Sequence, residues 1–283
     1  MVEKSGARPG KSRVLGGSLL AGILVWSGQA AAGWVIEQMQ KGGAEGGQQQ
    51  VTLQANRMKT LTVEPDGKPG MAFIVDLDAQ TITQVLYPER SYATATVQEY
   101  GQMMRGVMTD AMKQMQEALK DMPPQQRKMA EEMMRSQMGQ AGQKAQECRE
   151  ARIELRKTGQ QATIAGYPAV RYDVLADGKL DSELWIAKGI TAWRELDPRK
   201  LERLGAEMAK LAACGSPQRG QGFLGADSAS KLAHEGYPVR MVDRSGGGGT
   251  VEVVKAESRT VPAAEFQPPA GFARKTFREM MGQ

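Results

Sequence analysis

Methionine is the residue type whose number and spacing most strongly suggest chemistry in this chain. Ten of the 18 Met residues lie between Val97 and Glu147, and Met104, Met108 and Met112 are spaced by one helical turn. Thioether sulfur is a soft ligand that selects Cu(I). Methionine also favours helices and fills irregular apolar space. Hydrophobic packing or contact with an apolar ligand is therefore the favoured interpretation, and Cu(I) binding is the third-ranked alternative.

Residue types that usually perform catalysis are sparse. His234 is the only histidine, and no Gly-x-Ser-x-Gly motif is present. Residues 220–225 spell a dinucleotide-binding motif, but they follow an expected helix where that motif requires a strand. Four acidic residues surround one expected turn and are interpreted as solvated: Asp173, Asp177, Asp181 and Glu183. The sequence predicts no catalytic residue, no cofactor and no dedicated metal site, so we do not expect an enzyme.

The chain contains two cysteines, Cys148 and Cys214. In an exported protein, an even number of cysteines favours a disulfide. Two separate buried thiols are the alternative, because free cysteine is among the most buried residue types.

The N-terminus has the layout of a secretory signal peptide. Basic residues precede the apolar segment Val14–Trp26, and the small residues 30–32 follow it. The apolar segment has 13 residues, whereas a membrane-spanning helix needs about 20. We expect cleavage after Ala32, with Ala30 and Ala32 forming the recognition site, and a periplasmic or secreted mature protein.

The charge distribution gives no sign of nucleic-acid binding. The formal net charge is +5, of which +3 lies in residues 1–32. Basic residues elsewhere are interspersed with acidic ones, whereas nucleic-acid binding needs a basic patch. No segment after residue 32 is apolar enough to predict a transmembrane helix.

A helical hairpin is expected to position the methionines, as an insertion over residues 98–147. Apolar residues recur every three or four positions from Tyr100 to Met122, which is the helical period. Pro123 and Pro124 end this helix and begin a second one, to about Glu147. The residues expected to contact a ligand from this hairpin are Met104, Met108, Met112, Met115, Leu119, Met122, Met134 and Met138.

Short alternating segments on both sides of the hairpin predict an antiparallel sheet. Residues 34–97 read as a meander, and Met71, Phe73, Val75 and Leu77 share one face. Further strands are expected at 151–158, 163–165, 167–176, 179–187, 237–243 and 250–259. A further helix begins at Asp197-Pro198 and extends through Ala213, and residues 266–272 are expected to be irregular.

Three patches resemble a family of exported bacterial proteins catalogued only as a domain of unknown function. They are Val75-Asp-Leu-Asp with Ile82, Tyr87-Pro and Tyr92; Gly166-Tyr-Pro with Tyr172 and Leu184-Trp-Ile-Ala187; and Phe266-Gln-Pro-Pro-Ala-Gly-Phe272. The fold of that family is similar to that of the periplasmic lipoprotein carriers. That fold is a curved, half-open antiparallel barrel, and its open end is covered by helices. The resemblance implies a fold and brings no catalytic residues.

Together these observations predict an α+β protein. Residues 1–32 form a signal peptide, and residues 33–283 form one domain, a curved, half-open antiparallel β-barrel under a helical lid. By the resemblance, its function is non-catalytic binding of an apolar ligand, namely a lipid, an acyl chain or a lipidated partner. The second-ranked interpretation is an envelope protein-interaction or stress module that uses the Met-rich hairpin to bind a partner.

Overall fold

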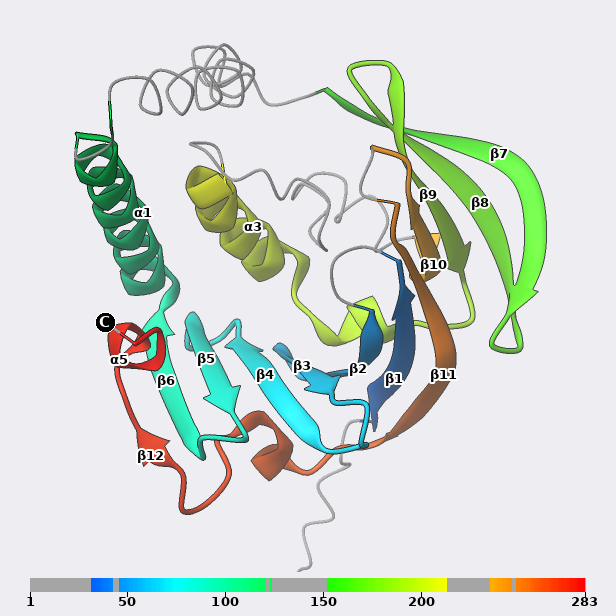
Figure 1. The fold of residues 1–283 in the computed structure, drawn as a ribbon. Helices are drawn as coiled ribbons and strands as arrows, with labels where there is room; N and C mark the ends of the chain where they lie inside the picture. Colours follow the sequence, from blue (N-terminus) through cyan, green and yellow to red (C-terminus); the bar gives the residue numbers. More distant parts are fainter. Residues whose placement is uncertain are drawn as a thin grey trace, which may run out of the picture. The chain divides into compact units, whose positions relative to one another are not determined.

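The structure, a computed structural model, describes residues 32–42, 46–120, 123, 152–212, 235–245 and 248–282. One 12-stranded sheet organises them (Figure 1). Its strands are β1 (Ala32–Lys41), β2 (Gly47–Gln54), β3 (Arg57–Val63), β4 (Pro69–Asp76), β5 (Thr81–Leu86), β6 (Ser91–Thr96), β7 (Ile153–Ile164), β8 (Tyr167–Ala176), β9 (Lys179–Ala187), β10 (Tyr237–Asp243), β11 (Thr250–Thr260) and β12 (Ala273–Arg274).

The sheet is open, with the strand order β12-β6-β5-β4-β3-β2-β1-β11-β10-β9-β8-β7. All neighbouring strands are antiparallel except β12 and β6. The pairing of β1 with β11 joins an N-terminal meander to a C-terminal one. The sheet curves strongly, and its edges β7 and β12 do not pair with each other (Figure 1). The expected half-open antiparallel sheet is therefore confirmed.

Tight turns set the register of the hairpins. Residues 54 and 57 pair across the β2–β3 turn, and the two turn residues, Ala55 and Asn56, have φ of 47° and 62°. Two-residue hairpins favour such positive φ values because the turn then matches the twist of the strands. Asp177 and Gly178 repeat this geometry between β8 and β9, with φ of 50° and 79°.

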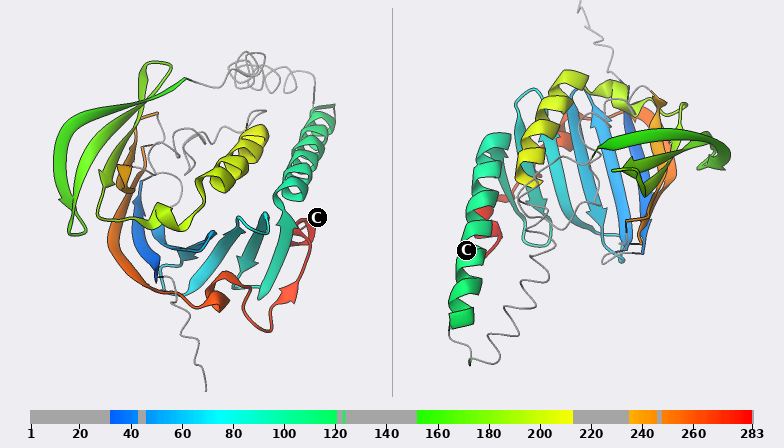
Figure 2. Two further views of the ribbon diagram at one scale, coloured as in Figure 1. Left: turned by 180° about the vertical axis from the view of Figure 1, so that it is seen from behind. Right: turned by 90° about the horizontal axis from the view of Figure 1, so that it is seen from above.

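Of the two long helices that the structure describes, one lies inside the curve of the sheet, and the other stands beside β6 near the sheet's edge. Helix α1 (Val97–Lys120) follows β6 directly, and helix α3 (Pro198–Ala212) follows the 3-10 helix η1 (Ala192–Glu195). Figure 1 shows α3 inside the curve of the sheet, and Figure 2 shows α1 beside β6 from behind and from above. These are the first hairpin helix and the further helix expected from the sequence. The second hairpin helix, 124–147, lies outside the described residues.

The C-terminal segment covers the opposite side of the sheet. Phe266, at the end of the 3-10 helix η2 (Ala263–Phe266), packs with buried Val35, Ile74 and Val85. The Lys59 ammonium, with its side chain 8% exposed, forms an ion pair with the Glu265 carboxylate at 2.8 Å. This coverage explains why β4 is apolar on both faces: Ala72 and Ile74 face the C-terminal segment, while Phe73 and Val75 pack on the helix side.

The strands predicted at residues 151–158 and 163–165 need correction. They form one strand, β7, with an irregularity in register between Lys157 and Gln161. The segment 266–272 is largely irregular as expected, but it is flanked by η2 and by β12, which pairs with β6. The short helix α5 (Phe277–Met280) then ends the described chain, and it begins with a capping box between Thr276 and Glu279.

Candidate binding surface

The concave side of the sheet carries one extensive buried apolar cluster. Its buried residues, here called the inner cluster, come from both meanders, both helices and η1. They are Trp34, Ile36, Val51, Leu53, Leu77, Ile82, Val97, Ile164, Ala169, Ala187, Ile190, Ala192, Leu196, Leu204, Tyr237, Val239 and Val253. Because strands from both meanders contribute, the cluster extends across the middle of the curved sheet.

Large apolar side chains surround the inner cluster and keep part of their area accessible to solvent. The largest are Met58, Phe73, Tyr100, Trp185, Trp193, Leu201 and Met208. They lie on the sheet, on both helices and on η1. The rings of Trp193 and Tyr237 stack with centroids 5.4 Å apart, and burial raises the pKa of the Tyr237 hydroxyl. An apolar molecule placed here would therefore meet aromatic and thioether side chains from several elements.

Helix α1 is anchored at its N-terminal end. The Thr96 hydroxyl accepts a hydrogen bond from the Glu99 N–H, and the Glu99 carboxylate accepts one from the Thr96 N–H at 2.8 Å. This reciprocal capping box fixes the point where the chain leaves β6. One turn on, the Tyr100 and Phe277 rings meet edge to face at 5.1 Å, so α5 supports the same end of α1. Among the described side chains, the inner cluster reaches α1 only through Val97 and Tyr100.

Helix α3 is also anchored at its N-terminal end, through a polar latch. The Asn56 N–H donates to the Glu195 carbonyl at 2.7 Å, and the Asn56 side-chain oxygen accepts from the Asp197 N–H at 2.7 Å. The Asp197 carboxylate caps the helix by accepting from the Arg199 N–H at 2.9 Å. Lys200 forms an ion pair with Asp78, which also accepts a hydrogen bond from the Asn56 side-chain amide. The β2–β3 turn thus holds the start of α3 against the sheet.

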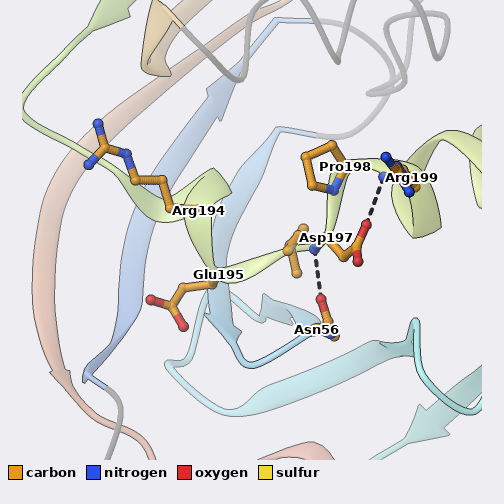
Figure 3. A pocket seen from close by; sticks show the side chains of 7 residues that line it. Asn56, Arg194, Glu195, Asp197, Pro198 and Arg199 are labelled. Atoms are coloured by element: carbon orange, nitrogen blue, oxygen red, sulfur yellow. Dashed lines mark hydrogen bonds between the residues drawn. The ribbon is translucent and has the colours of Figure 1, made fainter.

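A shallow pocket of about 580 Å³ lies beside this latch (Figure 3). Its lining residues are Asn56, Arg194, Glu195, Leu196, Asp197, Pro198 and Arg199. The acidic residues that line this pocket already accept hydrogen bonds within the protein. The Glu195 carboxylate accepts one from the Ala55 N–H at 3.2 Å, and the Asp197 carboxylate caps α3. The pocket is therefore mainly a product of the latch, and we assign it no ligand.

The latch makes a testable contribution to stability. Asn56→Gly removes the side-chain hydrogen bonds but tolerates the positive φ, so we expect a loss of about 1.5 kcal/mol in the free energy of unfolding. Asn56→Ala should lose roughly 1 kcal/mol more, because alanine is strained at that φ. Urea unfolding at neutral pH measures both values. Equal stability of the wild type and both variants would contradict the role of the latch.

An ionic network joins strands β7, β8 and β9 to the residue that follows β10. The Asp173 carboxylate accepts from Arg171 at 2.8 Å and from Arg156 at 3.2 Å, and the Glu183 carboxylate lies 3.2 Å from Arg171 and 2.8 Å from Arg244. Both carboxylate side chains are only 9% exposed. The expectation that this acidic group is solvated is therefore wrong for Asp173 and Glu183. Burial raises the pKa of Asp173, but the arginine hydrogen bonds outweigh it and hold that pKa below its ordinary value.

The network should give stability that is lost in acid. A carboxylate whose pKa is lower in the folded state stabilises the protein above its unfolded-state pKa of about 3.9, and this contribution falls as the pH drops through the folded-state value. At pH 7, Asp173→Asn should lower the free energy of unfolding by about 2 kcal/mol, because Arg171 loses one of its two buried carboxylate partners and Arg156 loses its ion pair. Urea unfolding at pH 7 and pH 3 should show that this difference shrinks in acid.

The matched control for Asp173 is Asp181→Asn. Asp181 lies on β9 and has no side-chain ion pair within the described part of the chain. We expect its substitution to change the free energy of unfolding by less than about 0.5 kcal/mol. An Asp173→Asn effect no larger than that of the control would contradict the network's contribution.

The hairpin residues expected to contact a ligand are only partly placed by the structure. Met104 and Leu119 lie on α1 and are partly buried. Met108, Met112 and Met115 also lie within α1, but their side chains are outside the described set. The following predicted residues lie outside the described residues altogether: Met122, Met134, Met138, Cys148, Cys214 and Ala30. Ala32, the other residue of the expected cleavage site, is the first residue of β1.

Two properties of the described residues bear on the alternatives. These residues contain no group of three or more His, Cys, Asp or Glu side chains that could hold a metal ion. Within the same residues, no helix combines the length and the apolar character needed to cross a membrane. Cu(I) binding through thioethers remains a separate hypothesis, because methionine sulfur is not among those ligand types.

Comparisons with known proteins identify a family and distant structural relatives. The family model described as Domain of unknown function (DUF4412) matches residues 87–272. No curated protein matches the sequence. An uncharacterized conserved protein from Thermus thermophilus is similar in structure, with a TM-score of 0.43, 10% identity, and coverage of 87% of this chain and 91% of that one.

The structure of MucB in complex with MucA(peri) has a TM-score of 0.36 and 11% identity, with coverage of 87% of this chain and 57% of that one. The Pseudomonas aeruginosa MucA/MucB complex has a TM-score of 0.35 and 12% identity, with 86% and 57% covered. The chain thus spans 57% of the length of the MucB chains. Similarity at this level assigns no function.

Proposed function

This chain belongs to the DUF4412 family, and we propose that it is a non-catalytic binding protein that holds an apolar ligand between its curved sheet and helices α1 and α3. The ligand class is a lipid or acyl chain, free or attached to a partner protein. The proposal includes export to the periplasm or the cell exterior, from the signal-peptide layout of residues 1–32.

The observation that carries the proposal is the partial exposure of the large apolar side chains around the inner cluster. Phe73, Trp185, Trp193 and Met208 surround it and are neither fully buried nor fully exposed. Side chains of this size normally complete a core or form an interaction site. Here they belong to the same cluster as residues of both helices, so a chain-shaped apolar molecule could contact several of them at once.

The anchoring of the helices gives the ligand a way to enter. α1 is fixed by its capping box and by the Tyr100–Phe277 contact, and α3 by the Asn56 latch, so both are held at their N-terminal ends. The helices contact each other. A modest change in their mutual packing would enlarge the space over the sheet without breaking either anchor. Methionine on α1 suits this role because its thioether side chain adapts to different shapes.

The energetics suit a passive carrier. Burying a 16-carbon acyl chain gains roughly 12 kcal/mol at about 0.8 kcal/mol per CH₂ group. Association and ordering cost at least about 4 kcal/mol of this. At this minimum cost about 8 kcal/mol remains, so the tightest dissociation constant expected is about 1 μM. Binding of the acyl chain needs no charged residue in the protein, which agrees with the apolar character of the inner cluster.

The proposal is tested by extracting the purified protein with organic solvent and analysing the extract by mass spectrometry. The expected result is a stoichiometric lipid or fatty acid that co-purifies with the folded protein and is absent after denaturation and refolding in lipid-free buffer. The refolded protein should then bind a fluorescent fatty acid in the micromolar range. If the extract holds no lipid and the probe does not bind, the protein-interaction alternative becomes the leading hypothesis.

A further inference from the structure

The two edges of the sheet differ greatly in length. Strand β12 has 2 residues, whereas β7 has 12 and pairs on one side with β8. Among the described residues, no strand lies beyond β7. A long exposed edge is a template for pairing with another strand. We propose that the first half of β7 pairs, antiparallel and with two-fold symmetry, with the same segment of a second copy of this chain.

The hydrogen bonds at the start of β7 show which backbone groups face outward. The Arg152 N–H donates to the Asp177 carboxylate at 2.9 Å, and the Arg152 carbonyl accepts from the Asp177 N–H at 3.0 Å. Both groups of Arg152 therefore point toward β8. Because this direction alternates along an antiparallel strand, Ile153, Leu155 and Lys157 present their N–H and C=O groups at the free edge.

Symmetry and charge favour a register centred on Leu155 over registers centred on Glu154 or on Arg156. A two-fold axis perpendicular to the sheet keeps each residue on its own face, so residues that oppose each other differ by an even number of positions. With Leu155 opposite the second copy's Leu155, Glu154 lies opposite Arg156 in both halves of the pair. Centring on Glu154 or on Arg156 would instead place like charges opposite each other, which is destabilising.

The side chains are available for this pairing. Glu154 is exposed and has no ion-pair partner within the described residues. The Arg156 side chain is 60% exposed, and its contact with Asp173 at 3.2 Å leaves other guanidinium N–H groups free. In the proposed register, Glu154 and Arg156 form non-hydrogen-bonded pairs, where opposing side chains are closest. Ile153, Leu155 and Lys157 then form the backbone hydrogen bonds.

The geometry also limits the strength of the contact. The register irregularity between Lys157 and Gln161, with Gly159 at φ 79°, ends the regular part of the edge. A contact of this length buries less area than a stable dimer needs. The dimer should therefore be weak, with a dissociation constant on the order of 100 μM.

Sedimentation equilibrium of the purified protein, from about 10 to about 500 μM, tests the proposal. The expected result is a weight-average mass that rises toward twice the monomer mass. Glu154→Arg should weaken this association at least about tenfold, because it places arginine opposite Arg156 of the second copy. Leu155→Pro should also weaken it, because it removes an outward N–H and leaves the hydrogen bonds to β8 intact.

Glu89→Arg is the matched control. It makes the same charge change in the exposed turn between β5 and β6, and it should associate like the wild type. A wild-type protein that stays monomeric throughout the concentration range would overturn the proposal. So would a dimer that Glu154→Arg leaves unchanged, because that dimer would use another surface. Glu154→Arg alone decides the matter if Leu155→Pro does not fold.

Discussion

Replacing Met108, Met112 and Met115 together with Gln is expected to weaken binding of a fluorescent fatty acid at least about tenfold. These positions lie within α1 at helical spacing. In the proposed binding site the amides would be buried against the ligand without hydrogen-bond partners, and each buried unpaired amide costs about 1–3 kcal/mol. Fluorescence titration of the delipidated protein measures the change in dissociation constant.

The control for this variant is the same triple substitution to Leu. Leucine keeps the apolar area and the helix propensity, so binding should change by less than about threefold. The two variants also separate lipid binding from copper binding, because neither Leu nor Gln has a soft sulfur and both should abolish a Cu(I) site. Suppose that the wild type binds Cu(I) but no fatty acid, and that both triple variants lose Cu(I) binding. Cu(I) binding would then replace lipid binding as the leading hypothesis.

Reduction of the protein is expected to lower its free energy of unfolding by about 4 kcal/mol, if Cys148 and Cys214 form the disulfide that the sequence favours. The bond would close a loop of more than 60 residues and so restrict the unfolded chain. Urea unfolding with and without reductant measures the effect, with the Cys148→Ser, Cys214→Ser variant as the reductant-insensitive control. Titration of two free thiols in the denatured, unreduced protein would refute the disulfide.

Local patterns predicted the strands well. The ranges expected for β8, β9 and β10 coincide with the observed strands, because alternating side chains bounded by turn residues specify them. The sequence Gly-Tyr-Pro occurs twice, at residues 166–168 and 236–238, and each copy leads into a strand, at Tyr167 and at Tyr237. In each case the proline lies at the second residue of the strand.

Long-range arrangement was not predictable in the same way. The pairing of β1 with β11 joins residues far apart in the chain, and no local pattern records it. The C-terminal segment was expected to be irregular, but its contact with the outer face of β3 through the Lys59–Glu265 ion pair was not. Apolar residues on both faces of β4 were a usable signal, since a strand with one solvated face alternates.

The acidic residues of β8 and β9 show a second reason why sequence reasoning fails. Asp173 and Glu183 are directly opposite each other across the hairpin, and each is neutralised by arginines. Arg156 lies opposite Asp173 because of the strand register before the irregularity in β7. Arg244 comes from a segment distant in sequence and forms an ion pair with Glu183. Charge pairing across strands depends on register, which the sequence alone does not provide here.

Of the residues proposed for the binding surface, the sequence indicated those on α1 and not those on the sheet. The apolar period of α1 was correctly recognised, but attention to methionine missed the sheet residues Phe73 and Trp185 and the η1 residue Trp193. These residues lie on elements whose relation to the helices becomes visible only in the folded sheet. Three of the four tryptophans, Trp34, Trp185 and Trp193, belong to or surround the inner cluster.

Those tryptophans permit the most direct test of the binding proposal. Bromine quenches indole fluorescence on contact, so delipidated protein is titrated with a brominated fatty acid and, in parallel, with the unbrominated acid. We predict saturable quenching by the brominated acid alone, and markedly less quenching in the Trp185→Phe, Trp193→Phe variant, which should still bind the fluorescent fatty acid. Equal and unsaturable responses to both acids in the wild type would contradict binding of an acyl chain at the inner cluster.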